Sequence, residues 1–370
     1  MATSEKPQVL GIDGRVLDDR FHGIGRITYE LLVRLATGER EIVLFLDEGQ
    51  QSQRFDLDAI AGLPGVRAVP FRHGLSSVTQ FLAWPSALRK AGVGVALFPY
   101  HLGAAVIGAR RRVAVIHDCI FEEDRSYAPD TRTRLLYIAL TKVVARRTTV
   151  VTPSLASAAA VGRFHHVRVP PEHVVEWGVG GQFSSAVTRP EVVNGRTIPD
   201  TYFLHVGARR PHKNVPHLVR VLASLPAHHH LILVGSADPR WPDETMSTAR
   251  ELGVADRVIE LSSVSEADLL GLYAGARAFL YPSFVEGFGL PLLEAMAAGT
   301  PVLASDIPVF REVAEGAGLL APPAEVEPWV RAVERLDDDV QRAAMIEGGR
   351  RRTAVTTWDR AAQRLEELIR

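Results

Sequence analysis

The sequence contains little that would cross-link the chain or hold it in a membrane. It has a single cysteine, Cys119, among 370 residues, so no disulfide can form within the chain. Proteins without disulfides are typical of reducing compartments. No apolar run approaches the ~18 residues that a membrane-spanning helix needs, and Met1 to Val9 lack the charged-then-apolar layout of a signal peptide. We therefore expect a cytoplasmic protein.

A strong net charge is also missing. The formal charge is -1, with 42 Lys and Arg against 43 Asp and Glu, which gives no reason to expect a nucleic-acid partner. The hydrophobic fraction of 46% and the charged fraction of 23% exclude a disordered chain, a collagen and a coiled coil. One stretch, residues 132–147, combines arginines with leucines. It predicts either a half-buried helix or a peripheral contact with the anionic inner membrane.

Short apolar segments alternate with amphipathic helical stretches along the whole chain. This alternation predicts parallel sheets with helices on both faces, so we expect an α/β fold of two doubly wound, Rossmann-like domains. The predicted strands are residues 9–13, 42–46, 95–98, 113–116, 149–152, 202–206, 231–234, 258–261, 278–281 and 302–304. The predicted helices are residues 27–35, 78–90, 131–147, 155–164, 215–225, 244–252, 266–274, 291–298 and 309–314.

A stretch rich in glycine and proline, residues 177–199, predicts the domain boundary. We expect domains at residues 1–180 and 181–350, followed by a C-terminal helix within residues 351–370. Two such domains would face a central cleft. Ligands of open α/β sheets bind at the carboxyl ends of the strands, so polar residues there are the candidates for chemistry.

The strongest motif is a glycine-rich loop flanked by two glutamates, residues 284–299 (FVEGFGLPLLEAMAAG). It follows a predicted strand and opens a helix. Gly287 and Gly289 let the backbone approach a ligand closely, and free amides at the helix start suit a phosphate. Glu286 can hold a sugar hydroxyl, and Glu294, one turn into the helix, can bind a ribose. The alternative is a turn with two solvated glutamates.

This segment resembles the Glu-x7-Glu signature of family 4 of the retaining glycosyltransferases, and the chain is similar to its bacterial mannosyltransferase-like members. The resemblance covers nearly the whole chain and implies the two-domain GT-B fold. It also implies that Glu294 binds the ribose of a nucleotide sugar and that Glu286 contacts the transferred sugar. The loop residues that would face the diphosphate and the sugar are Gly287, Phe288, Gly289 and Leu290.

A second motif, residues 206–214 (VGARRPHKN), lies between a predicted strand and a helix. A lysine at such a turn can neutralise a departing diphosphate, although many lysines there are simply solvated. The segment resembles the family's Arg…Lys-Asn motif, which implies that Lys213 is the diphosphate lysine. Relatives often carry an arginine immediately before the lysine or five before it, where this chain has His212 and Ala208. Arg209 is our candidate for the missing charge, with Arg210 and His212 as alternatives.

Two further candidates lie in the N-terminal half. Residues 21–26 (FHGIGR) contain Gly23 and Gly25 but lack the third glycine of a dinucleotide fingerprint, which disfavours NAD. The segment resembles the family's glycine-rich first loop and would contact the donor; otherwise it only launches a helix. His117 ends a predicted strand. It matches the family histidine that contacts the sugar near the anomeric carbon, or else it is structural. We expect Cys119 to be a buried small residue.

We expect no metal and no cofactor. Zinc-ligand spacing and a P-loop are missing, and the runs 228–230 (HHH) and 337–339 (DDD) have no companions typical of a metal site.

These interpretations predict a retaining, metal-independent glycosyltransferase. It would move a sugar from a nucleoside-diphosphate sugar, with GDP-mannose as the first candidate, to a hydroxyl of a glycan, a lipid-linked intermediate or a natural product. The N-terminal domain would bind the acceptor and the C-terminal domain the donor, and the last helix would cross back to the N-terminal domain. The alternatives are an epimerase or another GT-B enzyme without an acceptor, and a non-catalytic nucleotide-sugar-binding protein.

Overall fold

The computed structural model describes residues 8–370 except 20–21, 76 and 185–186, and the chain divides into two compact units. The first unit comprises the residues up to Glu122, Arg132–Trp177 and Trp358–Arg370. The second comprises Glu123–Thr131 and Gly178–Thr357. Among the described residues, no helix combines the length and the apolar character needed to cross a membrane.

The first unit is built on a six-stranded parallel sheet in the order β3-β2-β1-β4-β5-β6. Its strands are β1 (Leu10–Asp13), β2 (Ile42–Leu46), β3 (Val66–Pro70), β4 (Val95–Phe98), β5 (Arg111–Val115) and β6 (Thr149–Val151). The central strands β1 and β4 are buried along their whole length, because helices cover both faces of a parallel sheet. The strand order reverses between β1 and β4, which is where ligands of such sheets bind.

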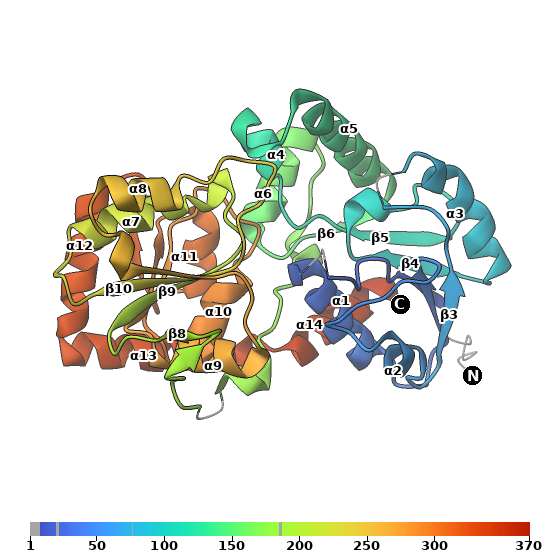
Figure 1. The fold of residues 1–370 in the computed structure, drawn as a ribbon. Helices are drawn as coiled ribbons and strands as arrows, with labels where there is room; N and C mark the ends of the chain where they lie inside the picture. Colours follow the sequence, from blue (N-terminus) through green and yellow to red (C-terminus); the bar gives the residue numbers. More distant parts are fainter. Residues whose placement is uncertain (1–7, 20–21, 76, 185–186) are drawn as a thin grey trace. The chain divides into compact units, whose positions relative to one another are not determined.

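The helices around this sheet include the last helix of the chain, α14, which packs along α1 (Figure 1). Arg34 donates to Asp359 at 2.6 Å and Arg40 pairs with Glu366 at 3.1 Å, so two ion pairs flank that contact. The helices are α1 (His22–Leu35), α2 (Leu57–Ala61), α3 (Thr79–Lys90), α4 (Ile120–Glu123), α5 (Thr131–Arg147), α6 (Leu155–His165) and α14 (Trp358–Ile369).

The second unit repeats the design, with the strand order β11-β10-β9-β12-β13-β14, all parallel, and a small antiparallel pair β7-β8. The strands are β7 (Val192–Val193), β8 (Arg196–Thr197), β9 (Tyr202–Val206), β10 (His230–Val234), β11 (Val258–Leu261), β12 (Ala278–Tyr281), β13 (Val302–Ser305) and β14 (Leu319–Ala321). The helices are α7 (Val215–Ala223), α8 (Thr245–Glu251), α9 (Glu266–Gly275), α10 (Leu290–Ala297), α11 (Pro308–Ala314), α12 (Val326–Glu334) and α13 (Asp339–Val355).

The predicted α/β class with two Rossmann-like sheets is confirmed, and each predicted strand is present. The prediction missed β3, an edge strand whose exposed residues interrupt any apolar run, and the three-residue β14. It also placed the start of the first helix too late. Helix α1 begins at His22, so Gly23 and Gly25 lie in its first turn rather than in a loop, and Phe21 lies outside the described residues. A Cβ on Gly25 would lie 2.8 Å from the carbonyl oxygen of Val16, so this close packing requires glycine.

A buried ion pair closes the carboxyl end of β1. The Arg15 guanidinium donates to both carboxylate oxygens of Asp13 at 2.7 Å, and both side chains are almost fully buried. Arg15 also donates to Gln80 at 3.1 Å and to the carbonyl of His73. One cation thus ties the end of β1 to the segment that follows β3 and to α3.

We predict that Asp13→Asn lowers the free energy of unfolding of the first unit by about 3–5 kcal/mol, because it leaves a buried guanidinium without its counter-charge. Asp306→Asn is the control. Its partner Arg311 is also two-point bonded but exposed, so the expected loss is below about 1 kcal/mol. Urea unfolding measures both variants, and equal losses would contradict the assignment.

Candidate functional site

The two C-terminal motifs meet at the carboxyl edge of the second sheet. Strands β9 and β12 are neighbours, and the strand order reverses between them. The loop after β9 carries Lys213, at the end of a short 3-10 turn (Pro211–Lys213), and the loop after β12 carries Glu286. The predicted ligand edge of this unit therefore holds both predicted residues.

Lys213 and Glu286 form a direct ion pair. The lysine Nζ lies 2.5 Å from Oε1 of Glu286, and their side chains are only 16% and 8% exposed. Lys213 also donates to the hydroxyl of Tyr281 at 3.0 Å, and the hydroxyl of Ser283 donates to Oε1 of Glu286 at 2.7 Å. The two predicted residues are thus held together by two partners that the motif did not reveal.

The electrostatics of this pair keep the lysine charged. Burial on its own would lower the pKa of Lys213, but the charge of Glu286 and the hydrogen bonds that the lysine donates to Glu286 and Tyr281 raise it well above its usual value. Burial, followed by the charge of Glu286, raises the pKa of the Tyr281 hydroxyl. A permanently charged ammonium and a protonated phenol therefore lie side by side, and both can donate to an anion.

The glycine loop leads directly into α10. Gly289 has a φ of 99°, and a Cβ there would lie 2.9 Å from the ring of Phe310. Gly289, the residue before the helix, has no side chain that could bond to the amides at its start. The side chain of Phe288 is buried, so this residue offers a ligand only its backbone. The loop has the form that an anion site at a helix start requires.

Glu294 lies one turn into α10, as predicted. The hydroxyl of Tyr273, on α9, donates to its Oε2 at 3.0 Å. This bond fixes the direction of a half-buried carboxylate. The sequence pointed to Glu294 but not to Tyr273, which is 21 residues away.

The predicted arginine partner of Lys213 has other partners. Arg209 donates to Asp243 at 2.7 Å and to the carbonyl of Gly235 at 2.8 Å, and it pairs with Glu260 at 2.8 Å. Within the described residues, Arg209 forms no hydrogen bond or ion pair with Lys213 or Glu286, so its role at the diphosphate stays a prediction.

The two alternatives to Arg209 are also engaged. Arg210 pairs with Asp238 at 2.9 Å, and its guanidinium lies 5.9 Å from the ring centre of Trp241. Burial lowers the pKa of His212 well below its usual value, so this ring is neutral.

A segment from the N-terminal half of the sequence, Glu123–Thr131, belongs to the second unit and contacts the loop that carries Lys213. The ring of Tyr127 lies 5.8 Å from that of His212, next to Lys213. The indole of Trp241 donates to the carbonyl of Ser126 at 3.2 Å. No local pattern could have revealed these contacts, because each joins segments at least 85 residues apart.

In the first unit, His117 lies two residues beyond β5. Its Nε2 donates to the carbonyl of Pro99 at 2.7 Å, which leaves Nδ1 as the acceptor. Burial lowers the pKa of His117 to about 4, so the ring is neutral near pH 7. Its ring centre lies 6.0 Å from that of Trp177. A neutral ring held in one tautomer suits a polar contact with a sugar.

The two glycines in the first turn of α1 differ in exposure. Gly23 is exposed, whereas Gly25 is buried and closely packed.

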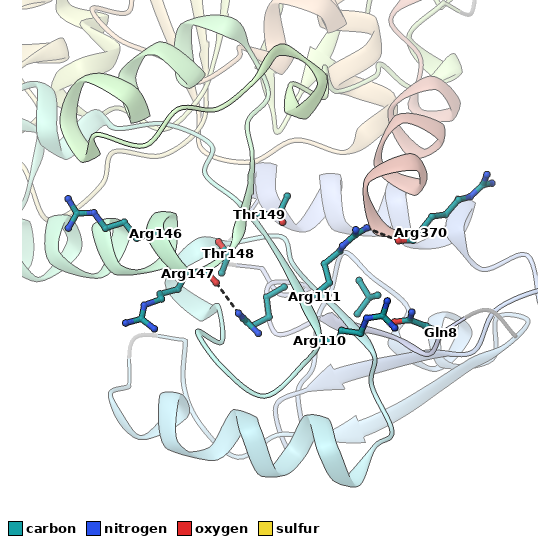
Figure 2. Close-up of a pocket in the computed structure, with 10 residues that line it drawn as sticks. Gln8, Arg110, Arg111, Arg146, Arg147, Thr148, Thr149 and Arg370 are labelled. Carbon is teal, nitrogen blue, oxygen red and sulfur yellow. Dashed lines mark hydrogen bonds between the residues drawn. The ribbon is translucent and has the colours of Figure 1, made fainter. Parts of the chain in front are cut away.

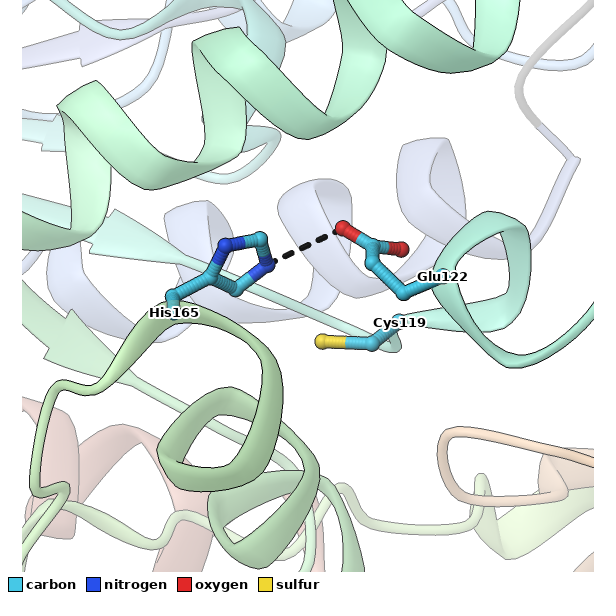
Figure 3. A group of neighbouring side chains, drawn as sticks. All are labelled: Cys119, Glu122 and His165. Carbon is cyan, nitrogen blue, oxygen red and sulfur yellow. Dashed lines mark hydrogen bonds and ion pairs between the residues drawn. The ribbon is translucent and has the colours of Figure 1, made fainter.

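One group of side chains in the described part of the chain has the composition of a metal site: Cys119, Glu122 and His165 (Figure 3). All three are buried, which confirms the prediction for Cys119. His165 donates from Nε2 to Oε1 of Glu122 at 2.9 Å, whereas Oε2 of Glu122 and Nδ1 of His165 are buried without a hydrogen-bond partner. The predicted absence of a metal stays a prediction.

Comparison with known proteins identifies the family. Residues 192–352 match the family described as glycosyl transferases group 1. O-antigen chain mannosyltransferase B of Escherichia coli is 30% identical over 260 residues, which cover 67% of each chain. The chain belongs to the group 1 glycosyltransferases. This confirms the family indicated by residues 286–294.

Other relatives match a smaller part of their length. O-antigen chain mannosyltransferase RfbU of Salmonella typhimurium is 40% identical over 147 residues, which cover 39% of this chain and only 41% of that protein. Among solved structures, sucrose-phosphate synthase from Thermosynechococcus elongatus superposes with a TM-score of 0.75 at 19% identity and 98% coverage of both chains. WaaG, a glycosyltransferase of lipopolysaccharide biosynthesis, gives 0.70 at 19% identity and covers 98% of this chain and 99% of its own. The fold is therefore GT-B.

We predict that Gly289→Ala lowers the melting temperature of the second unit more than Gly316→Ala. Both glycines have positive φ, which costs an alanine about 1–3 kcal/mol, but nothing lies within 4 Å of a Cβ on Gly316. Gly289→Ala must in addition displace the ring of Phe310. Thermal unfolding compares the two variants, and equal shifts would show that Phe310 does not constrain the loop.

Proposed function

We propose that this glycosyltransferase moves a sugar from a nucleoside-diphosphate sugar to an acceptor hydroxyl, with retention of configuration and without a metal or cofactor. The observation that carries the proposal is the ion pair of Lys213 and Glu286 beside the start of α10. It places a cation suited to a diphosphate next to a carboxylate suited to sugar hydroxyls. The second unit would bind the donor and the first unit the acceptor.

In the proposed reaction, the bond between the anomeric carbon and the diphosphate oxygen breaks, and a bond from that carbon to the acceptor oxygen forms on the same face. The departing diphosphate takes the proton of the acceptor hydroxyl. Lys213 leaves its ion pair with Glu286 and pairs with the diphosphate, whose negative charge grows as the bond breaks. Glu286, released from the lysine, accepts hydrogen bonds from the sugar. In the first unit, Nδ1 of His117 is a candidate acceptor for a sugar hydroxyl. The amides of the glycine loop hold the phosphates, and Glu294 holds the ribose.

Among the cations of the loop after β9, we assign the diphosphate to Lys213. Arg209 lies between two carboxylates and a carbonyl, which supports a role in holding this loop. Lys213 has one carboxylate partner and can exchange it.

For the donor we propose GDP-mannose. Several relatives are named as mannosyltransferases, which supports this donor. One of them is an MMP alpha-(1->4)-mannosyltransferase of Mycolicibacterium hassiacum that is 32% identical over 234 residues. A UDP-sugar is the alternative, because HepE of Anabaena, similar in fold at 19% identity, was solved with UDP and glucose. The relatives named as O-antigen chain enzymes support a glycan acceptor.

We predict that one nucleoside diphosphate selectively raises the melting temperature in a panel of GDP, UDP, dTDP, CDP, ADP and NAD, with the same result with and without magnesium. At about 100 times its dissociation constant, the ligand should add about 2.7 kcal/mol of stability. A response to NAD alone would overturn the proposed function. A shift that requires magnesium would contradict the metal-independent reaction.

We predict that Glu286→Gln keeps nucleoside-diphosphate binding but lowers sugar transfer by about 100-fold or more, whereas Lys213→Met lowers both. Glu327→Gln, an exposed carboxylate on α12, is the control and should change neither. Transfer is measured with the donor identified by the panel and a glycan acceptor. Unchanged turnover of Glu286→Gln would contradict its role, and sugar release without an acceptor would indicate an epimerase or hydrolase.

We further propose a cytoplasmic enzyme that contacts an anionic membrane through α5. This helix contains no acidic residue, and Leu135, Leu136 and Val143 are 59%, 46% and 47% exposed on it. An exposed apolar stripe flanked by arginines suits an anionic lipid surface.

We predict that the protein sediments with phosphatidylglycerol vesicles and that changing Leu135, Leu136 and Val143 to serine reduces the bound fraction several-fold. The control changes three exposed apolar residues of the second unit, Val192, Leu252 and Val340, to serine. Equal losses in the two triple variants would contradict the role of α5.

A further inference from the structure

A pocket of about 520 Å³ lies at the edge of the first sheet opposite to His117 (Figure 2). Val95, Arg111 and Thr149, the first residues of β4, β5 and β6, all line it. His117 follows the other end of β5. The pocket is therefore separate from the carboxyl edge, where the proposed sugar chemistry takes place.

The pocket concentrates positive charge that the chain does not balance. Six of its ten lining residues are arginines and none is an aspartate or glutamate. The arginines are Arg110, Arg111, Arg112, Arg146, Arg147 and Arg370. In the described part of the chain, only Arg370 forms an ion pair, with Glu366 at 3.6 Å. Since the whole chain has a formal charge of -1, this cluster is a local feature, and an anion would relieve its repulsion.

Two of the arginines are fixed by backbone carbonyls. Arg112 donates to the carbonyls of Ala109 at 2.5 Å and Arg147 at 3.2 Å, and Arg111 donates to those of Leu368 and Arg370 at 3.1 and 2.6 Å. The Nε of Arg112 is buried and has no hydrogen-bond partner. Protein atoms cover this Nε, so a ligand in the pocket would meet the other donors of the cluster instead.

Helix ends explain part of the cluster. Arg146 and Arg147 lie in the last turn of α5, where cations are favourable next to free carbonyls. Arg111 bonds to the carbonyls at the end of the chain, next to α14. Helix ends do not account for Arg110, which is exposed and forms no side-chain hydrogen bond or ion pair with the described residues. The arginine N–H groups that have no acceptor within the protein could donate to an added anion.

We propose that this pocket binds a small anion that carries two or more phosphate groups. Arginine matches phosphate oxygens in pairs of hydrogen bonds. The cavity is larger than one phosphate needs and within the range of small-molecule sites. Val95 is the only apolar residue among the ten that line it, which favours a compact, highly charged ligand over a lipid chain. Figure 2 shows Arg146 and Arg147 on one side of the pocket and Arg111 and Arg370 on the other, with the side chains of Arg146, Arg147 and Arg370 extending outward.

The test is calorimetric titration of the full chain with sodium pyrophosphate and tripolyphosphate at constant ionic strength. The variant changes Arg110, Arg146 and Arg147 to glutamine and should weaken binding by at least about tenfold. The control changes Arg89, Arg132 and Arg168, three exposed arginines of the same unit outside the pocket, to glutamine and should weaken it by less than about threefold. Arg110→Gln alone, a milder change at an exposed residue, should weaken it by about threefold and keeps the test valid if the triple variant does not fold.

Further arms separate the sources of binding. Lys213→Met should keep pyrophosphate binding at this pocket, so loss of all binding in that variant would place the anion at the donor site and overturn the proposal. Equal weakening in the two triple variants would attribute binding to diffuse charge and would also overturn it. No heat of binding at millimolar pyrophosphate, together with arginine-dependent binding to phosphatidylglycerol vesicles, would show that the cluster contacts a membrane instead.

Discussion

The ion pair between Lys213 and Glu286 holds together the loops that follow two neighbouring strands. Charges this far removed from water are costly unless each has a partner, so the position of one loop depends on the other. Tyr281 and Ser283, at and just beyond the end of β12, add hydrogen bonds to the same two groups. In the proposed reaction, a donor would exchange partners with a pair that already exists. The protein therefore carries both charges in place before any ligand arrives, which reduces the reorganisation that the proposed reaction requires.

The two edges of a parallel sheet differ in their electrostatic character, and the first unit has a candidate site at each edge. Helices start near the carboxyl ends of the strands and finish near the amino ends, so partial positive and negative charges gather at opposite edges. At the carboxyl edge, a neutral His117 is fixed by the carbonyl of Pro99. At the amino edge, arginines donate hydrogen bonds to main-chain oxygens at the ends of α5 and α14. More arginines gather there than the helix ends require, and that surplus distinguishes the arginine pocket from ordinary helix capping.

Sequence patterns predicted the features that depend on local order and missed those that depend on tertiary contact. Buried strands such as β1 and β4 show as continuous apolar runs, whereas the exposed edge strand β3 does not. The early start of α1 depends on how closely Gly25 packs against Val16. The motifs located Glu286, Lys213 and Glu294, but the side chains that orient them could not be read from spacing. Tyr273 comes from another helix, and the partners of Arg209 come from segments beyond the motif.

Arg209 illustrates why motif spacing cannot choose among neighbouring cations. In the sequence, Arg209, Arg210 and Lys213 are all plausible partners of a diphosphate, because each follows the same strand. The structure separates them by the charge that surrounds each one. Arg209 faces two carboxylates, Asp243 and Glu260, which together outweigh its own charge. Lys213 faces one carboxylate and a phenol that can itself donate. This difference in surrounding charge is the reason for proposing Lys213 as the partner of the diphosphate, although the residues nearby contain more arginine than lysine.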